Sequence, residues 1–161
     1  MKLQDVKNLP TTQIKTMNNT SFKSLKNLNK LEREFWNTRN HDTKELVIKI
    51  VNSKDSFDTK CLTVLRSGFW DELLKTQDIN LIKKAIKRKD FNINVTSIYP
   101  EIYPNALFRA ADFGKNFLKE FLQREDIKFE QKNFYGDTIL SIAQNRDWKE
   151  IVKIIKTKMN I

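Results

Sequence analysis

The stretch NALFRAADFGKNFLKEFL, residues 105–122, decides the fold of this 161-residue chain. Its apolar residues fall into two groups at helical spacing, each typical of one buried helix face. The groups are Ala106, Leu107, Ala110 and Ala111, and then Phe117, Leu118, Phe121 and Leu122. Gly114 lies between them and predicts a break. Neither helix is long enough to persist alone, so both must pack against neighbouring elements.

The same arrangement returns at residues 138–155, TILSIAQNRDWKEIVKII. Ala143 follows Ala110 by 33 residues, and Ile151 follows Leu118 by the same interval. Two short antiparallel helices that recur at this period indicate a stacked repeat. The small alanines are expected to let neighbouring first helices approach closely, so each unit is stabilised by its neighbours.

Fainter copies precede this pair. Leu73 lies 37 residues before Ala110, and Thr38 lies 35 residues before Leu73. The expected buried residues are Trp70, Leu73 and Leu74, then Leu81, Ile82, Ala85 and Ile86, and in the earliest copy Phe35, Leu46, Val47, Ile50 and Val51. We therefore predict an all-α repeat solenoid with projecting hairpin loops over residues 30–161. Its units are expected at about 30–63, 64–100, 101–135 and 136–161.

The composition argues against catalysis. Cys61 and His41 are the only residues of their kinds, too few for a disulfide, a zinc site or a nucleophilic triad. Asp71, Glu72, Glu125 and Asp126 are expected to be solvated surface acids. No apolar run exceeds three residues, so we expect no signal peptide and no membrane span. The expected protein is a non-enzyme without cofactor or metal, intracellular (cytoplasmic or nuclear) and not secreted.

Residues 105–114 and 136–143 resemble the opening of the ankyrin repeat, which reads Gly-Xaa-Thr-Pro-Leu-His-Xaa-Ala-Ala and is followed by a glycine turn. Glu150-Ile151-Val152-Lys153-Ile154-Ile155 is similar to the second helix of that repeat, and residues 132–136 to its hairpin tip. The matches are degenerate, since the Thr-Pro pair is Asn105-Ala106 in one unit and Thr138-Ile139 in the next. Before residue 64 a generic α-hairpin solenoid fits equally well.

The resemblance implies protein binding at the hairpin tips and along the exposed side of the first helices. The hairpin at 94–104 is about four residues longer than the period needs and carries two Tyr and two Ile. Its aromatic residues either contact a partner or fold back onto the repeat. The candidate protein-binding residues are Tyr99, Glu101, Ile102, Tyr103, Arg109, Asp112, Phe113, Phe134 and Tyr135. Trp36, Trp70 and Trp148 are expected to be packing residues instead.

The formal net charge is +10 and unevenly distributed. Residues 1–29 are polar and basic without a clear apolar period, and we interpret them as a flexible arm or an N-terminal cap. A second basic cluster consists of Lys83, Lys84, Lys87, Arg88 and Lys89. It is either a solvated helix face or, with the arm, a nucleic-acid-binding site.

These observations lead to two hypotheses of function. The first is a monomeric protein-interaction module that acts as a stoichiometric binder, inhibitor or decoy of another protein, one that could be acidic. Viruses and intracellular bacteria use stand-alone members of the ankyrin family in this way, and the Lys-, Asn- and Ile-rich composition is compatible with such an origin. The alternative is a basic nucleic-acid-associated protein. It lacks a recognised nucleic-acid motif and aromatic residues interleaved with the charges.

Overall fold

The computed structural model describes residues 30–37, 43–57, 63–64, 67–94 and 102–161. These ranges contain the helices α3 (Lys30–Asn37), α4 (Lys44–Asn52), α5 (Phe69–Lys75), α6 (Ile79–Ile86), α7 (Ala106–Phe113), α8 (Lys115–Phe121), α9 (Ile139–Asn145) and α10 (Lys149–Met159). The helical class predicted from the sequence is thereby confirmed. Each of the four predicted segments contains one helix pair. Residues 1–29, the predicted arm, lie outside the described ranges.

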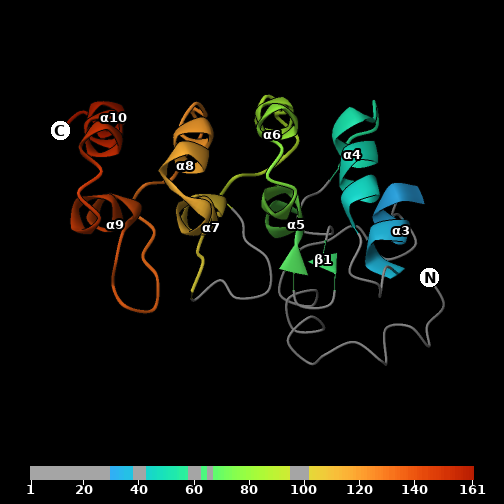
Figure 1. The fold of residues 1–161 in the computed structure, drawn as a ribbon, viewed down its shortest axis with the longest axis horizontal. Coiled ribbons are helices and arrows are strands. Elements are labelled where there is room, and N and C mark those ends of the chain that lie inside the picture. The colour runs from blue at the N-terminus through green and yellow to red at the C-terminus, as the bar shows by residue number, and fades with distance from the viewer. Residues whose placement is uncertain (1–29, 38–42, 58–62, 65–66, 95–101) are drawn as a thin grey trace.

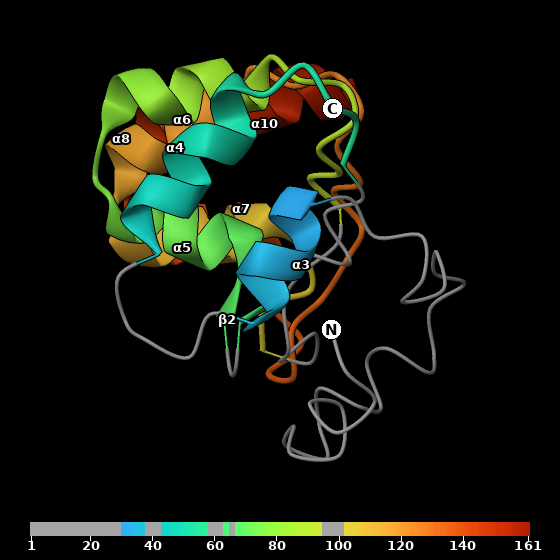
Figure 2. The same cartoon turned by 90° about the vertical axis from the view of Figure 1, so that its right-hand side faces the viewer.

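The helix pairs stand in a row and form two layers (Figure 1). The second helices α4, α6, α8 and α10 make one layer, in which each helix contacts the next. The first helices lie in the other layer, where α5 contacts α7 (Figure 2). The described loops before α7 and α9 project from the side of the first helices.

A short element was not predicted. Strands β1 (Thr63–Val64) and β2 (Ser67–Gly68) pair antiparallel just before α5. Two residues per strand are too few to leave an alternating apolar pattern in the sequence.

Local sequence explains where the helices begin and end. Thr138 caps α9, its hydroxyl accepting from the Ser141 N–H at 3.2 Å, and Asn105 caps α7 by accepting from the Leu107 N–H at 3.0 Å. The predicted break at Gly114 is confirmed. Its φ of +131° and ψ of 166° belong to a region open almost only to glycine, which lets α8 begin immediately after α7.

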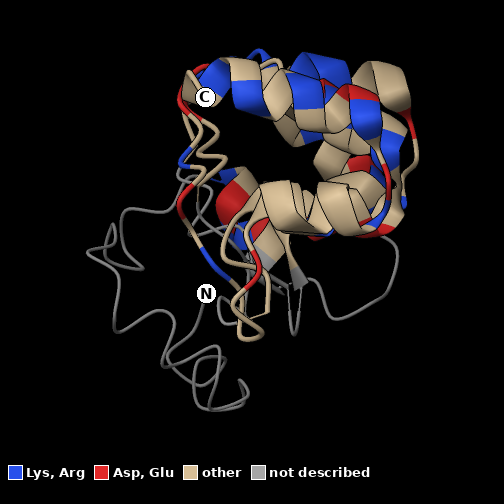
Figure 3. Cartoon of the chain, turned by 90° about the vertical axis from the view of Figure 1, so that its left-hand side faces the viewer, with Lys and Arg blue, Asp and Glu red and all other residues tan. Residues whose placement is uncertain are grey.

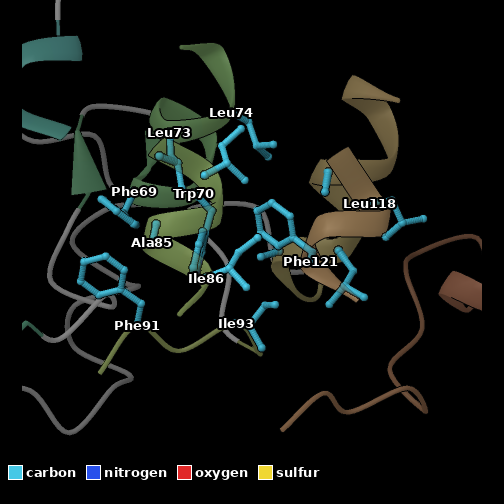
Figure 4. Close-up of a cluster of buried hydrophobic side chains, with 14 of the residues drawn as sticks. Phe69, Trp70, Leu73, Leu74, Ala85, Ile86, Phe91, Ile93, Leu118 and Phe121 are labelled. Carbon is cyan, nitrogen blue, oxygen red and sulfur yellow. The ribbon is translucent and has the colours of Figure 1, made fainter. Parts of the chain in front are cut away.

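The apolar core runs the length of the array, and Figure 4 shows the part of it where the second helix pair meets the third. Trp70 packs edge-on against Phe121 of the next pair, with ring centroids 5.3 Å apart. Ala110, Ala111 and Ala143 are buried as predicted. Trp70 is also buried and Trp148 packs against the core, as expected of packing residues. The side chain of Trp36 lies outside the described part of the structure.

The prediction that Asp71 and Glu72 are solvated was wrong, because both side chains are buried at the start of α5. Asp71 accepts from the Gly68 N–H at 3.1 Å and from Arg109 Nε of α7 at 2.8 Å. Glu72 accepts from the Thr43 hydroxyl and from Lys75 Nζ. Asp71 therefore links α5 to α7, and Glu72 links α5 to Thr43 before α4. Burial of the two carboxylates is tolerated because these hydrogen bonds replace the hydrogen bonds they would make to water. Glu125 and Asp126 are exposed, as predicted.

Candidate functional site

The most exposed large apolar side chains of the described chain are two neighbours on the loop before α9. Phe134 is 77% exposed and Tyr135 is 78% exposed. Their rings meet edge to face, with centroids 5.6 Å apart and an interplanar angle of 85°. We call this feature the aromatic tip. Two adjacent, mutually oriented aromatic rings in solvent form a small apolar surface of defined shape.

The backbone beneath the aromatic tip is tied together by Asn133. The Asn133 side-chain oxygen accepts from the Tyr135 N–H at 3.0 Å and the Asp137 N–H at 2.9 Å. Its backbone C=O accepts from the Gly136 N–H, and its N–H donates to the Asp137 C=O, both at 3.0 Å. Gly136 has a φ of +81°, which suits a tight turn without steric cost. The predicted hairpin tip at 132–136 is therefore a well-braced turn.

A second group of predicted residues gathers on α7 and the loop before it. Arg109 Nη1 donates to the Tyr103 hydroxyl at 3.2 Å, and the guanidinium carbon lies 5.0 Å from the centre of the Tyr103 ring. Burial raises the pKa of the Tyr103 phenol, and the neighbouring Asp112 carboxylate raises it further. Tyr103 thus folds back onto the repeat, which is one of the two arrangements expected for this hairpin. Ile102 beside it is 42% exposed.

The charged side chains of this group form ion pairs and hydrogen bonds with other residues of the chain. Arg109 bonds to buried Asp71 and lies 3.6 Å from Asp112. Arg146 of the next pair donates to the Ala111 C=O at 2.7 Å and reaches Asp112 at 3.4 Å. In the structure these residues connect successive helix pairs, so their predicted role as partner contacts stays a prediction.

Phe113 is half-buried, in edge-to-face contact with Phe117 of α8, with centroids 6.2 Å apart. It therefore offers a partner less free surface than the aromatic tip does. Tyr99 and Glu101 lie outside the described residues. The structure thus brings Tyr103, Arg109, Asp112 and Phe113 into one cluster, and it places Phe134 and Tyr135 together on a separate loop.

The predicted basic cluster divides into two kinds of residue. Lys83, Lys84, Lys87 and Lys89 are exposed. Arg88 is different, since only 16% of its side chain is exposed. Its guanidinium lies 4.4 Å from the centre of the Phe91 ring and pairs with Asp90. We therefore separate Arg88 from the exposed lysines.

Arg88 belongs to a series of side-chain hydrogen bonds to backbone carbonyls of the preceding helix pair, which the sequence analysis did not predict. Arg88 donates to the carbonyls of Ile50, Val51, Ser53 and Asp55 at the end of α4. Arg124 donates in the same way to the carbonyl of Ile86, the last residue of α6, and to those of Arg88 and Phe91 after it. Lys158 then donates to the Arg124 C=O at 3.2 Å. These three cations, which we call the carbonyl clamps, satisfy helix-end acceptors of the preceding pair.

The sequence carried a signal for the clamps in the motif Arg-Xaa-Asp, which stands at residues 88–90 and again at 124–126. In both copies the Asp accepts two bonds from the Arg of the same motif. The aspartate orients the planar guanidinium and leaves its remaining N–H groups for the carbonyls. Spacing alone did not reveal that these carbonyls belong to another helix pair.

The described ranges contain no group of three or more His, Cys, Asp or Glu side chains that could hold a metal ion. Within the same ranges, no helix is both long enough and apolar enough to cross a bilayer.

Comparisons of the chain with models of protein families, with curated proteins and with solved structures found no match.

Proposed function

We propose that this chain is a protein-binding module of the ankyrin type that acts by stoichiometric association and not by catalysis. The observation that carries the proposal is the aromatic tip, in which Phe134 and Tyr135 stand about three-quarters exposed on a braced turn. Tyrosine and other aromatic residues are enriched among the residues that dominate binding energy at interfaces.

The arrangement of helices supports the ankyrin type. Four pairs of short helices stand side by side, and their described loops project from the layer of first helices (Figure 1). In the residues that carry the resemblance, Asn105 and Thr138 cap first helices and Gly114 separates the two helices of a pair. Each pair buries its apolar face against its neighbours, as a repeat array requires.

The rigidity of the aromatic tip favours binding. A partner gains from burying two rings, at about 25 cal/mol per Å² of apolar surface and on the order of 150 Å² per ring. That corresponds to a gross contribution of about 3–4 kcal/mol for each ring before the cost of association. Because Asn133 already fixes the turn, little loop entropy is lost when the partner binds.

The complementary partner is a protein with an apolar pocket or groove that accepts the two rings. When bound, the module would cover the face of the partner that holds this pocket. Blocking a surface in this way is how an inhibitor or decoy acts. Ile102 and Phe113 could extend the contact toward the first helices, since both retain exposed surface.

The test compares the proteins retained from a lysate of the producing cells by wild type and by the double variant Phe134→Ser, Tyr135→Ser. A photo-crosslinking amino acid at position 135 should label one protein at a one-to-one ratio, and the same reagent at position 153 of α10, in the opposite layer, should not. We expect the double variant to lose that protein. Identical retention by wild type and variant, or equal labelling from both positions, would contradict the proposal.

A further inference from the structure

The layer formed by the second helices is strongly basic, although the layer beneath it is not. Together α4, α6, α8 and α10 contain ten lysines and three glutamates. The first helices α3, α5, α7 and α9 contain four basic and five acidic residues. Figure 3 shows the blue residues gathered in the layer that includes α10, while α9 carries neither colour. The fold therefore sorts charge between its two layers.

Contacts between neighbouring helices show that the outward faces of this layer adjoin one another. Lys84 of α6 bonds to the Asn52 side chain of α4, and Lys83 lies 3.8 Å from Glu120 of α8. Lys119 of α8 in turn bonds to Glu150 of α10, and the resulting hydrogen bond and charge lower the pKa of that carboxyl. The four helices thus present one continuous surface.

Most of the positive charge on this surface has no counterion among the described residues. Glu120 and Glu150 are each paired with one lysine, which leaves Glu45 as the remaining acid of these helices. The exposed lysines of the layer for which the structure shows no bond are Lys49, Lys115, Lys149, Lys153 and Lys156, with Lys87 directly after α6. Lys115, Lys119 and Lys149 also line a pocket of about 270 Å³ between α8 and α10, whose lining includes two acids, Asp147 and Glu150.

We infer that this surface, the lysine layer, binds the phosphate backbone of double-stranded nucleic acid without reading its sequence. Four helices packed at interaxial distances of about 8–10 Å extend over roughly 25–30 Å. A duplex carries one phosphate charge per about 1.7 Å of axis, so this width faces a dense row of phosphates.

The kinds of side chain on this surface favour a nucleic-acid duplex over other polyanions as the ligand. Lysine is depleted at protein interfaces, whereas as a hydrated point charge it suits phosphate. Single strands need aromatic platforms, but the exposed large apolar residues of the described chain are Ile102, Phe134, Tyr135 and Ile161, none of them within these helices. The apolar residues of these helices that keep some exposure, such as Val152, Ile154 and Met159, are half-buried, so the layer offers no fully exposed apolar side chain for insertion into a lipid surface.

The lysine layer differs from the basic site considered from the sequence. Arg88 is excluded because it clamps α4, and α10 contributes more charge than α6 does. The surface also lies on the opposite layer from the first helices and the loop of the aromatic tip. The inference is therefore independent of the proposed protein-binding function.

The experiment measures binding of the full chain to a fluorescent 30-base-pair duplex of arbitrary sequence by anisotropy, at salt concentrations between 50 and 300 mM. With about four to six phosphates contacted, the logarithm of the affinity should fall against the logarithm of salt with a slope of roughly −4 to −5. The variant Lys153→Gln, Lys156→Gln should weaken binding at 100 mM salt by about tenfold or more, and reduce the slope by about 1.8.

A matched control removes the same two charges elsewhere. Lys128 and Lys132 are exposed on the loop between α8 and α9, and the variant Lys128→Gln, Lys132→Gln should weaken binding less than about threefold. Tyr135→Ser should leave duplex binding unchanged. Circular dichroism should show the same helix content in all variants.

The inference is overturned by equal losses in the two lysine variants, since binding would then reflect net charge or the basic residues 1–29. The absence of duplex binding at 50 mM salt would overturn it too. Equal or tighter binding of a 30-nucleotide single strand would contradict the choice of a duplex. Binding to vesicles with 30% phosphatidylserine that needs Lys153 and Lys156, together with duplex binding that does not, would assign the layer to a membrane surface instead.

Discussion

Removing the Arg88 side chain should destabilise the first helix pair and leave the far end of the array intact. In the structure Arg88 Nη1 donates to the carbonyls of Ile50 at 2.9 Å and Ser53 at 2.7 Å, and Nη2 donates to the Asp55 carbonyl at 2.6 Å. Asp90 accepts from Nε at 3.0 Å and from Nη2 at 2.7 Å. Arg88→Ala deletes all of these bonds together.

The magnitude follows from the number and kind of bonds. A hydrogen bond to a charged group contributes about 1.5–3 kcal/mol when it is removed alone. The bonds share one guanidinium, and water can reach some carbonyls once the side chain is gone, so the losses do not add fully. We expect Arg88→Ala to lower the free energy of unfolding by about 3–5 kcal/mol, in the range of breaking a largely buried ionic network.

Two further variants separate the contribution of the guanidinium from that of its charge and from that of an exposed neighbour. Arg88→Lys keeps the charge but loses the planar fork, so it should cost about half as much as Arg88→Ala. Lys87→Ala changes an exposed neighbour and should stay within about 0.5 kcal/mol of wild type.

The assay combines urea unfolding, followed by circular dichroism, with hydrogen exchange measured by mass spectrometry. Because repeat units contact only their neighbours, peptides from α4 should exchange faster in Arg88→Ala, while peptides from α10 should keep their protection. A loss below about 1 kcal/mol with unchanged protection of α4 would refute the assignment of Arg88 as a clamp.

Three other outcomes test the structure. Gly114→Ala should cost about 2–3 kcal/mol in urea unfolding, because its φ and ψ are open almost only to glycine although no atom lies within 4 Å of the added methyl group. The hydrogen bond from Arg124 lowers the pKa of Asp126 in the folded protein. The ionised Asp126 carboxylate therefore stabilises the fold fully above the ordinary carboxyl pKa, and this contribution is lost as the pH falls through the folded-state pKa. Asp126→Asn should accordingly flatten the acid side of a plot of the free energy of unfolding against pH, below about pH 4. Tyr135→Ser should change the free energy of unfolding by less than about 0.5 kcal/mol, because the ring is exposed, and a larger loss by calorimetry would show that the aromatic tip packs on the repeat.

The helix pairs were predictable because the apolar residues that form their faces recur at similar intervals, 33 to 37 residues apart. Leu118 and Ile151, at equivalent places in successive units, are both buried. The breaks were predictable for a local reason, since Gly114 adopts a backbone conformation that other residues avoid.

The polar contacts between units were not predictable in the same way. Asp71 and Arg109 are 38 residues apart, and their pairing depends on how two helix pairs are rotated against each other. The contact of Tyr103 with Arg109 is local, since the two residues lie in the same unit, but the apolar pattern does not tell whether an aromatic loop residue packs on the following helix or faces solvent. A regular spacing predicts which residues are buried, but it does not predict which charges meet.

Part of the candidate site followed from sequence and part did not. The aromatic tip was predicted from residues 132–136, and the structure shows both rings exposed there. The lysine layer was not predicted, because each second helix contributes only two to four lysines. The positive charge becomes dense only when the fold places these four helices side by side, and this cannot be seen along the chain.

The carbonyl clamps also bear on the elasticity of the array. Apolar contacts between helix pairs have no preferred direction, so they resist small sliding and twisting motions only weakly. The bonds of Arg88 and Arg124 are directional, and each joins one pair to the helix end of the pair before it. Arg109 and Arg146 make directional bonds between successive pairs on the side of the first helices. Successive pairs are therefore tied in both layers, and the array should resist sliding of one pair past the next more strongly than apolar packing alone would.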